Sequence, residues 1–368
     1  MRVTYIVHKF SIKKNEFKIY TLAKKMRKLG FDVSIITSKI NNKEKNGCNN
    51  IPIYRLRSLD FKNLFIKTNY PYIFGIKDII RKIEPDIVHA QSHLFLSTYN
   101  AVMASSEFNI SSIVSVHGFK VKRGIIVNAI QKIYLTTIAK RIFKKASIIH
   151  CLNQYEANIV KSFYPKANIV IIPNGIDTVL FKPSKEKLYN QITWVGRMVK
   201  EKGLIYLLKA IEIVCKNNPQ IKLTLIGDGP LRPEIEKYII DKKLNDNINL
   251  LGWQSGEKVA KILSKSSIFI LPSLSEGMPR ALLEAMSSGN AIIATNIPQI
   301  REIIKHGVDG LLINPGDYIS LAKYIIWYLN NKKIVKKFAE RARKKIIKNY
   351  SLDMEISRLE SLYKSLAN

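Results

Sequence analysis

Cysteine is scarce in this sequence, and the few cysteines are too far apart to suggest a metal site. The 368 residues include only Cys48, Cys151 and Cys215. An odd number of widely spaced cysteines is typical of reduced thiols in a cytosolic protein, and we expect each of them to serve packing. No disulfide framework is therefore expected, and a cytoplasmic location is favoured.

Long hydrophobic runs are also lacking. No stretch reaches the roughly 18 consecutive apolar residues that a membrane-spanning helix requires. Met1 and Arg2 lead directly into the strand-like run Val3–Val7, so we expect no signal peptide. The composition, 46% hydrophobic and 24% charged, excludes a disordered chain, and the length suffices for two domains of ordinary size.

Acidic residues are few compared with basic ones. The chain has 60 Lys and Arg against 28 Asp and Glu, a net charge of +32, and the excess is larger in the first half. No acid occurs between Phe108 and Tyr155, which hold eight basic residues: Lys120, Lys122, Arg123, Lys132, Lys140, Arg141, Lys144 and Lys145. Such a field favours an anionic membrane surface or a polyanion, and a solvated helix face is the alternative.

Several chemistry-bearing motifs are missing. The sequence has no Walker loop, no G-x-G-x-x-G after its first strand, no His-Glu-x-x-His and no Asp-x-Asp of the kind that metal-dependent transferases use. We therefore predict neither a metal nor a resident cofactor. In a metal-free mechanism, cations and helix N-termini would supply the electrostatic stabilisation.

Strand-like apolar runs alternate with helical patterns along the whole chain, which indicates parallel sheets covered by helices. In the first half these runs are Val3–Val7, Val33–Thr37, Ile87–Ala90, Ile113–Val116, Ser147–Cys151 and Ile169–Ile172. In the second half they are Ile192–Val195, Leu223–Ile226, Ile248–Leu251, Ile268–Leu271, Ala291–Ala294 and Gly310–Ile313. The fold class is thus α/β, with two Rossmann-like domains whose ligands bind at the carboxyl ends of the strands.

The rest of the chain is organised around the stretch Pro272–Gly289. It follows the buried strand Ile268–Leu271. Pro279 is expected in the first turn of a helix that continues from Arg280 to Ser288 and that Gly289 ends. A helix start favours an anion such as a phosphate. The carboxylates Glu276 and Glu284 suit hydroxyl groups instead, so the natural ligand is a diphosphate that carries sugars. Ordinary complementation of the helix dipole is the alternative explanation of these acids.

A second loop, Gly196–Gly203, follows the first strand of the second half and precedes a helix. Its glycines shape the turn, and Arg197 and Lys202 can hold a diphosphate from two directions. For either cation taken alone, an exposed charge without a function is the alternative.

These two loops resemble those of the retaining GT-B glycosyltransferases of family four. The resemblance rests on Glu276-Gly277-x-Pro279 with Glu284 eight positions after Glu276, and on Gly-Arg-(four residues)-Lys-Gly from Gly196. It implies two Rossmann-like domains whose sheets face one another across a cleft. It also implies that Glu276 contacts the donor sugar, that Glu284 contacts the ribose hydroxyls, and that Arg197 and Lys202 neutralise the leaving diphosphate.

The resemblance extends to further positions. It implies a catalytic His117 near the donor sugar, and donor contacts at Gly227, Trp253, Gly277, Met278 and Pro279. Trp253 could stack on the base or belong to the core. One departure concerns the loop after the first strand, where Lys13 and Lys14 replace two glycines that usually let the backbone approach a ligand closely.

The domain boundary is predicted at Pro173–Asp177, where Pro and Asn-Gly mark a break and a turn. Residues 1–173 would form the acceptor domain and residues 174–350 the nucleotide-sugar donor domain. The segment 351–368 reads as a helix with Ser351 as its cap, and the resemblance implies that it crosses back to the first domain.

We therefore expect a retaining, metal-independent glycosyltransferase of the hexosyltransferase type, with a UDP-sugar as the favoured donor. The expected partners are a nucleotide sugar and a lipid-linked glycan or cell-envelope polysaccharide precursor, with peripheral contact at the cytoplasmic face of an anionic membrane and no nucleic acid. The alternatives are a GT-B nucleotide-sugar epimerase, a basic protein that binds nucleic acid or a membrane surface, and a catalytically idle membrane partner.

Overall fold

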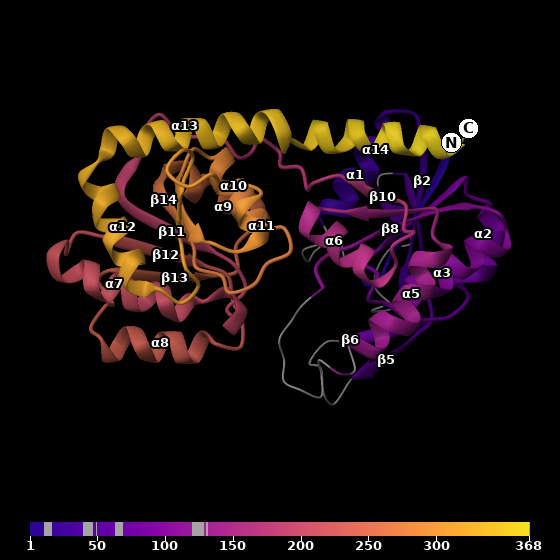
Figure 1. Ribbon diagram of the computed structural model, residues 1–368, viewed down its shortest axis with the longest axis horizontal. Helices are drawn as coiled ribbons and strands as arrows, with labels where there is room; N and C mark the ends of the chain where they lie inside the picture. The colour runs from indigo at the N-terminus through magenta and orange to yellow at the C-terminus, as the bar shows by residue number, and fades with distance from the viewer. Residues whose placement is uncertain are drawn as a thin grey trace. The chain divides into compact units, whose positions relative to one another are not determined.

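The structure is a computed structural model that describes residues 1–10, 17–39, 47–48, 50–62, 69–119, 129 and 132–367. The chain divides into two compact units (Figure 1). The first contains Met1–Pro173 and Ile356–Asn368, and the second contains Asn174–Glu355. Among the helices of the described residues, none combines the length and the apolar character that crossing a membrane requires.

The first unit contains a sheet with the strand order β10-β9-β8-β7-β1-β2-β4-β3, in which only the short β3 runs antiparallel to its neighbour. Its strands are β1 (Arg2–Val7), β2 (Asp32–Ser38), β3 (Gly47–Cys48), β4 (Ile51–Leu56), β7 (Ile87–Gln91), β8 (Ser111–Ser115), β9 (Ile148–Cys151) and β10 (Ile169–Ile171). A separate antiparallel pair consists of β5 (Ser58–Lys62) and β6 (Asn69–Ile73).

Helices connect the strands of the first unit. They are α1 (Phe17–Lys28), α2 (Ile76–Ile83), α3 (Leu96–Glu107), the π-helical turn η1 (Leu135–Ala139), α5 (Lys140–Lys145), α6 (Gln154–Phe163) and most of α14 (Leu352–Ala367). The sheet is covered by apolar side chains, and Val88, Ala90, Val114 and Ile149 from neighbouring strands are fully buried in one core cluster.

The second unit contains a fully parallel sheet with the strand order β13-β12-β11-β14-β15-β16. Its strands are β11 (Leu188–Val195), β12 (Lys222–Ile226), β13 (Ile248–Gly252), β14 (Ser266–Leu271), β15 (Ala291–Thr295) and β16 (Leu311–Ile313). Its helical segments are η2 (Lys200–Lys202), α7 (Leu204–Asn217), α8 (Arg232–Asp241), α9 (Gly256–Lys265), α10 (Arg280–Ser287), α11 (Pro298–Arg301), α12 (Tyr318–Asn330) and α13 (Lys332–Asn349).

The order of the strands in the second unit creates a switch point between β11 and β14. The chain builds the sheet outward from β11 to β13 on one side, and then from β14 to β16 on the other. Every residue of the central strand β14 is buried because helices cover both faces of the sheet. Since crossovers leave in opposite directions at a switch point, the loops there border a crevice at the carboxyl ends of the strands.

The predicted α/β class with two mostly parallel sheets is confirmed, and the structure adds elements that the sequence did not predict. The sheet of the first unit gains β4, which pairs in parallel with β2, and the antiparallel pair β5–β6 is also new. One detail was wrong: Pro279 does not lie in the first helical turn. Its ψ of 102° makes it the cap residue that precedes α10, which begins at Arg280.

Two segments far apart in sequence run side by side where the second unit begins and ends. The amide of Ile176 donates to the Tyr350 carbonyl, and the amide of Leu352 donates to the Ile176 carbonyl, each at 2.9 Å. The amide of Gly175 donates to the buried carboxylate of Glu355 at 2.8 Å. The predicted cap of the last helix is also present, because the Ser351 hydroxyl accepts from the Met354 amide at 3.3 Å.

A chain of buried hydrogen bonds joins α14 to the sheet of the first unit. The Tyr363 hydroxyl lies 3.0 Å from that of Tyr5 and 2.7 Å from Nδ1 of His89. Ser115 connects Nε2 of His89 to Nδ1 of His150, at 2.8 Å on each side. Beyond it, Nε2 of His150 donates to a backbone carbonyl at 2.7 Å.

The carbonyl at the end of this chain fixes its direction, because a carbonyl oxygen can only accept. His150 therefore donates from Nε2. With neutral rings, its Nδ1 then accepts from Ser115, and His89 in turn donates to Ser115 and accepts from Tyr363. Burial first, and then the neighbouring His150, lower the pKa of His89 well below its usual value, which agrees with a neutral ring.

Candidate functional site

The two loops singled out in the sequence lie next to one another at the switch point of the second unit. Gly196–Gly203 follows β11 and Pro272–Pro279 follows β14, and these strands are neighbours in the sheet. The amide of Leu274 donates to the Glu201 carbonyl at 2.8 Å, so the loops are also joined directly. The sheet thereby places Arg197, Lys202 and Glu276 at one edge.

Two glycines permit the close packing of these loops. Gly203 has φ +62°, and a Cβ there would lie 2.1 Å from the Pro272 carbonyl oxygen. Gly227 follows β12 with φ +129°, and a Cβ there would lie 1.8 Å from the Gly196 carbonyl oxygen. Both distances are far below van der Waals contact, so any other residue at either position would push the loops apart.

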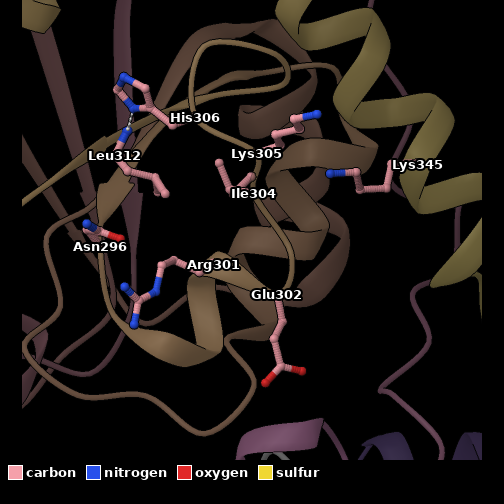
Figure 2. Close-up of a pocket in the computed structure, with 8 residues that line it drawn as sticks. All are labelled: Asn296, Arg301, Glu302, Ile304, Lys305, His306, Leu312 and Lys345. Carbon is pink, nitrogen blue, oxygen red and sulfur yellow. Dashed lines mark hydrogen bonds between the residues drawn. The ribbon is translucent and has the colours of Figure 1, made fainter.

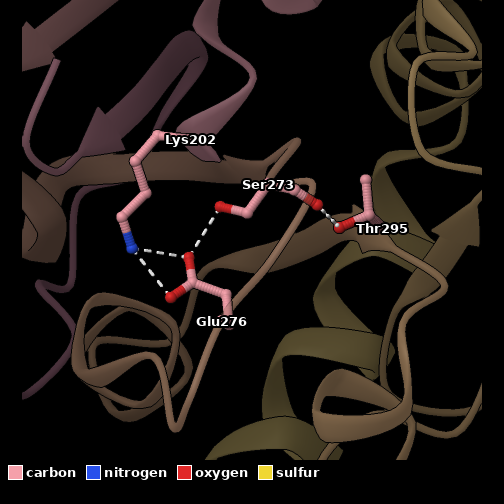
Figure 3. A network of polar contacts seen from close by, with 4 residues as sticks. All are labelled: Lys202, Ser273, Glu276 and Thr295. Atoms are coloured by element: carbon pink, nitrogen blue, oxygen red, sulfur yellow. Dashed lines mark hydrogen bonds and ion pairs between the residues drawn. The ribbon is translucent and has the colours of Figure 1, made fainter. Parts of the chain in front are cut away.

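Lys202 and Glu276 form an ion pair at the centre of the site (Figure 3). The ammonium of Lys202 lies 2.7 Å from both carboxylate oxygens of Glu276, and the hydroxyl of Ser273 donates to Oε1 at 2.6 Å. Thr295, at the end of β15, donates to the Ser273 carbonyl at 2.5 Å and so holds this loop in place. The Glu276 side chain is 6% exposed and that of Lys202 is 26% exposed, so solvent or a ligand reaches the pair from the lysine side.

Arg197 is an exposed cation on a fixed backbone. The amide of Gly196 before it donates to the Ile226 carbonyl at 3.0 Å, and that of Met198 after it donates to the Asp228 carbonyl at 2.8 Å. Met198 is fully buried, which anchors the turn in the core. The backbone of Arg197 is thus held in place, and its side chain lies at the surface.

Glu284 lies on α10 and pairs with Arg280 one turn earlier, with Oε1 at 3.5 Å from Nη2. The carboxyl is 14% exposed. Burial raises its pKa, and the charge of Arg280 opposes this rise. A carboxyl of raised pKa is a good partner for hydroxyl groups, because it accepts hydrogen bonds as a carboxylate and also donates one when protonated.

The remaining predicted donor contacts lie at the ends of other strands of the same sheet or in the loop before α10. The sulfur of Met278 accepts from the Asn174 amide at 3.2 Å, which ties the loop before α10 to the start of the second unit. Trp253 directly follows β13 and is 57% exposed, so it is not a core residue. Gly227 belongs to the same edge, because its amide donates to the Gly252 carbonyl at 2.8 Å.

His117 belongs to the first unit and follows β8. His117 is an exposed residue, and its Nε2 lies 3.2 Å from Oε1 of Gln91 at the end of β7. The loop is held by Glu156, a buried residue of α6 that the sequence did not single out. The Glu156 carboxylate accepts from the amides of Gly118 at 2.8 Å and Leu152 at 3.0 Å, which positions the backbone next to His117.

Lys13 and Lys14 lie outside the described residues, as do Lys120, Lys122 and Arg123 of the basic stretch. Within the described ranges, no cluster of three or more His, Cys, Asp or Glu side chains is arranged to hold a metal ion.

A cavity of about 650 Å³ lies elsewhere in the second unit (Figure 2). Asn296, Arg301, Lys305, His306 and Lys345 contribute to its wall. Arg197, Lys202, Glu276 and Glu284 do not line it. The candidate site at the switch point, where Lys202 and Glu276 form their ion pair, is therefore distinct from this cavity.

Two family descriptions match the chain over adjoining regions. "Glycosyl transferases group 1" matches residues 176–345, and "Glycosyltransferase Family 4" matches residues 18–180. The chain belongs to glycosyltransferase family four. It is a GT-B glycosyltransferase, and the resemblance inferred from the two loops is confirmed.

Relatives of this glycosyltransferase include enzymes whose names specify lipid acceptors. The chain is 27% identical to the Escherichia coli UDP-Gal:alpha-D-GlcNAc-diphosphoundecaprenol alpha-1,3-galactosyltransferase, over 82% of this chain and 81% of the relative. It is 25% identical to one component of the Arabidopsis thaliana phosphatidylinositol N-acetylglucosaminyltransferase, over 78% of this chain and 65% of that protein.

Solved structures of low sequence identity share the fold over nearly the whole chain. Sucrose-phosphate synthase from Thermosynechococcus elongatus aligns with a TM-score of 0.84 at 19% identity, covering 99% of this glycosyltransferase and 98% of that chain. Anabaena HepE in complex with UDP and glucose aligns with a TM-score of 0.80 at 17% identity, covering 99% and 100%.

Proposed function

We propose that this glycosyltransferase moves a sugar from a UDP-sugar to a hydroxyl group of a lipid-linked glycan, such as a cell-envelope polysaccharide precursor. We further propose that the anomeric configuration is retained and that no metal is required. The names of the E. coli and A. thaliana relatives support a lipid-linked acceptor, and the E. coli name supports a UDP-sugar.

The observation that carries the proposal is the ion pair between Lys202 and Glu276, whose two charges balance one another. A diphosphate carries more negative charge than one carboxylate, so it would draw the Lys202 ammonium toward itself, with Arg197 as a second cation. The Glu276 carboxylate, still held by Ser273, would then accept hydrogen bonds from the hydroxyls of the donor sugar.

In this proposal the bond between the anomeric carbon and the β-phosphate oxygen breaks, and a bond from the acceptor oxygen forms on the same face of the sugar. The proton of the acceptor hydroxyl passes to the departing phosphate oxygen. Lys202 and Arg197 stabilise the charge that develops on the diphosphate. Glu284 holds the ribose, and Trp253 and Gly227 contact the nucleotide. No side chain is assigned as a general base.

The first unit would bind the acceptor, with His117 near the transferred sugar. The net charge of +32 of the whole chain, and the lipid acceptors named for the relatives, support a location at the cytoplasmic face of a membrane.

A transfer assay tests the proposal. The purified enzyme is incubated with UDP-sugars and a diphosphoundecaprenol-linked sugar, with and without EDTA, and the product anomer is determined by NMR. We expect transfer with retention that EDTA does not abolish. The Glu276→Gln variant should lose transfer, whereas Glu257→Gln, which changes an exposed acid of α9, should keep it.

Each alternative has its own outcome. Isomerisation of a UDP-sugar without acceptor would identify an epimerase and overturn the proposal. Inversion of the anomer or loss of activity with EDTA would contradict the proposed mechanism. Equal transfer by Glu276→Gln and the wild type would contradict the role of Glu276.

A further inference from the structure

Helix α13 carries an unusual concentration of positive charge. Nine of its 18 residues are Lys or Arg, and Glu340 is its single acid. Its inner side packs in the core through five buried residues: Val335, Phe338, Ala339, Ala342 and Ile346. Helix α8 is different, because its Arg232 pairs with Asp228 before the helix and with Glu236 within it.

Two of the nine basic side chains are partly buried and attach the helix to its own unit, and the exposed Arg341 makes a longer hydrogen bond to the Val308 carbonyl at 3.4 Å. Arg343 donates to the carbonyls of Phe181, at 3.1 Å, and Ser287. Lys345 donates to the Ile303 carbonyl at 2.8 Å and forms an ion pair with Asp309. Figure 2 shows Lys345 projecting from α13 toward the segment that carries Ile304 and Lys305.

The other seven basic residues are exposed and define what we call the basic face: Lys332, Lys333, Lys336, Lys337, Arg341, Lys344 and Lys348. At about 100° per residue they occupy one arc of roughly 180°, opposite the buried side chains, along a helix of about 27 Å. Two exposed isoleucines accompany these charges. Ile334 borders the arc and is 37% exposed, and Ile347 lies within it and is 46% exposed.

The charges of the basic face are largely uncompensated. In the part of the chain that the structure describes, no ion pair involves Lys333, Lys336, Lys337, Lys344 or Lys348. Lys332 lies 5.2 Å above the ring of Tyr189, which leaves its charge in place. Several like charges held on one rigid surface repel one another, and an anionic partner relieves that repulsion.

We propose that the basic face of α13 docks on an anionic lipid bilayer. A helix with a basic, exposed surface and a few apolar side chains matches the interfacial zone of a membrane, where lysines contact lipid phosphates and isoleucines enter the headgroup layer. The exposed Ile334 and Ile347 favour a bilayer over a nucleic acid, because apolar side chains are stabilised in the headgroup layer and find no partner among the phosphates of a nucleic acid. This inference rests on the membrane location in the proposed function and deepens it, because it assigns that contact to the donor unit rather than to the basic stretch Phe108–Tyr155.

Vesicle binding tests the inference without any substrate. Binding of the full chain to vesicles of phosphatidylglycerol and phosphatidylcholine is compared with binding to phosphatidylcholine alone, at low and high salt. The test variant is Lys333→Gln/Lys337→Gln/Lys344→Gln. The control is Lys258→Gln/Lys261→Gln/Lys265→Gln, which removes the same charge from exposed positions of α9.

We expect the α13 variant to bind anionic vesicles roughly a hundredfold more weakly, because each basic residue near the surface contributes about fivefold. The control should lose far less, and salt should weaken binding of the wild type. Transfer to a detergent-solubilised acceptor should be unchanged in both variants. If the wild type transferred no sugar, the proposed function would be contradicted, but the comparison of vesicle binding would still test the docking of α13.

Equal vesicle binding by both variants would overturn the inference and point to another surface. It would also be overturned if the α13 variant lost affinity for double-stranded DNA but kept its affinity for vesicles. Circular dichroism of each variant verifies that α13 remains folded.

Discussion

Removal of Lys202 should destabilise the second unit more than removal of Glu276. Lys202→Met leaves a carboxylate that is 6% exposed and that keeps its hydrogen bond from the Ser273 hydroxyl. Breaking a buried ion pair in this way costs about 3–5 kcal/mol. Lys202 itself is 26% exposed, so water will relax part of this, and we expect a loss of about 2–3 kcal/mol in the free energy of unfolding.

Glu276→Gln should lower the free energy of unfolding less than Lys202→Met does. The amide oxygen can still accept from Ser273, and the Lys202 ammonium that loses its partner is already accessible to water. We expect a loss of about 1 kcal/mol, in the range of one net hydrogen bond. The double variant should cost less than the sum of the two single ones, because neither charge is then left alone.

Urea unfolding followed by tryptophan fluorescence measures these differences in unfolding free energy for the second unit, which contains Lys202 and Glu276. The three tryptophans, Trp194, Trp253 and Trp327, all lie within Asn174–Glu355. Lys258→Met, at an exposed position of α9, is the control and should stay within about 0.5 kcal/mol of the wild type. The reasoning is refuted if Lys202→Met costs no more than Glu276→Gln, or if the two changes are additive.

Three further predictions concern the units separately. Tyr363→Phe removes the donor to Nδ1 of His89 and should cost about 1–3 kcal/mol of unfolding free energy by circular dichroism; an unchanged value would contradict the buried hydrogen-bond chain. Burial lowers the pKa of His93 to about 3, so the unfolded state binds the proton first and stability that is present above about pH 6.5 is lost as the pH falls. Between pH 6.5 and pH 5 the wild type should lose about 2 kcal/mol more than His93→Leu, and equal losses would refute this. Gly227→Ala would place a Cβ 1.8 Å from the Gly196 carbonyl oxygen, so it should weaken UDP binding at least tenfold by calorimetry, and unaltered affinity would count against the packing of the two loops.

The sequence predicts those parts of the site whose signals are local. Glycines, a proline and charged residues at strand ends mark the loops that carry Arg197, Lys202 and Glu276, and the alternating runs predict the α/β class. The strand Ile51–Leu56 was not predicted because Pro52 and Arg55 interrupt its apolar pattern near the edge of the sheet.

Contacts between distant residues could not be predicted. Lys202 and Glu276 are 74 positions apart, and Tyr5 and Tyr363 are 358 positions apart. Periodicity and turn chemistry describe neighbours within a few residues, whereas these pairs depend on the order of strands in the sheet and on the path of α14. Glu156 was missed because an acid in the first turn of a helix usually complements the helix dipole, and the sequence does not show that it also binds the amide of Gly118.

The central claim is that a sugar nucleotide binds the second unit through cations on its diphosphate and carboxyl groups on its hydroxyls. Thermal unfolding of the wild type, Arg197→Ala and Glu284→Gln in the presence of UDP, GDP and ADP tests it most directly, because a nucleotide that binds only the folded state must raise the melting temperature. We predict that UDP raises the melting temperature of the wild type and that both variants lose most of this rise. The claim is contradicted if no nucleotide stabilises the wild type, or if the variants are stabilised as much as the wild type.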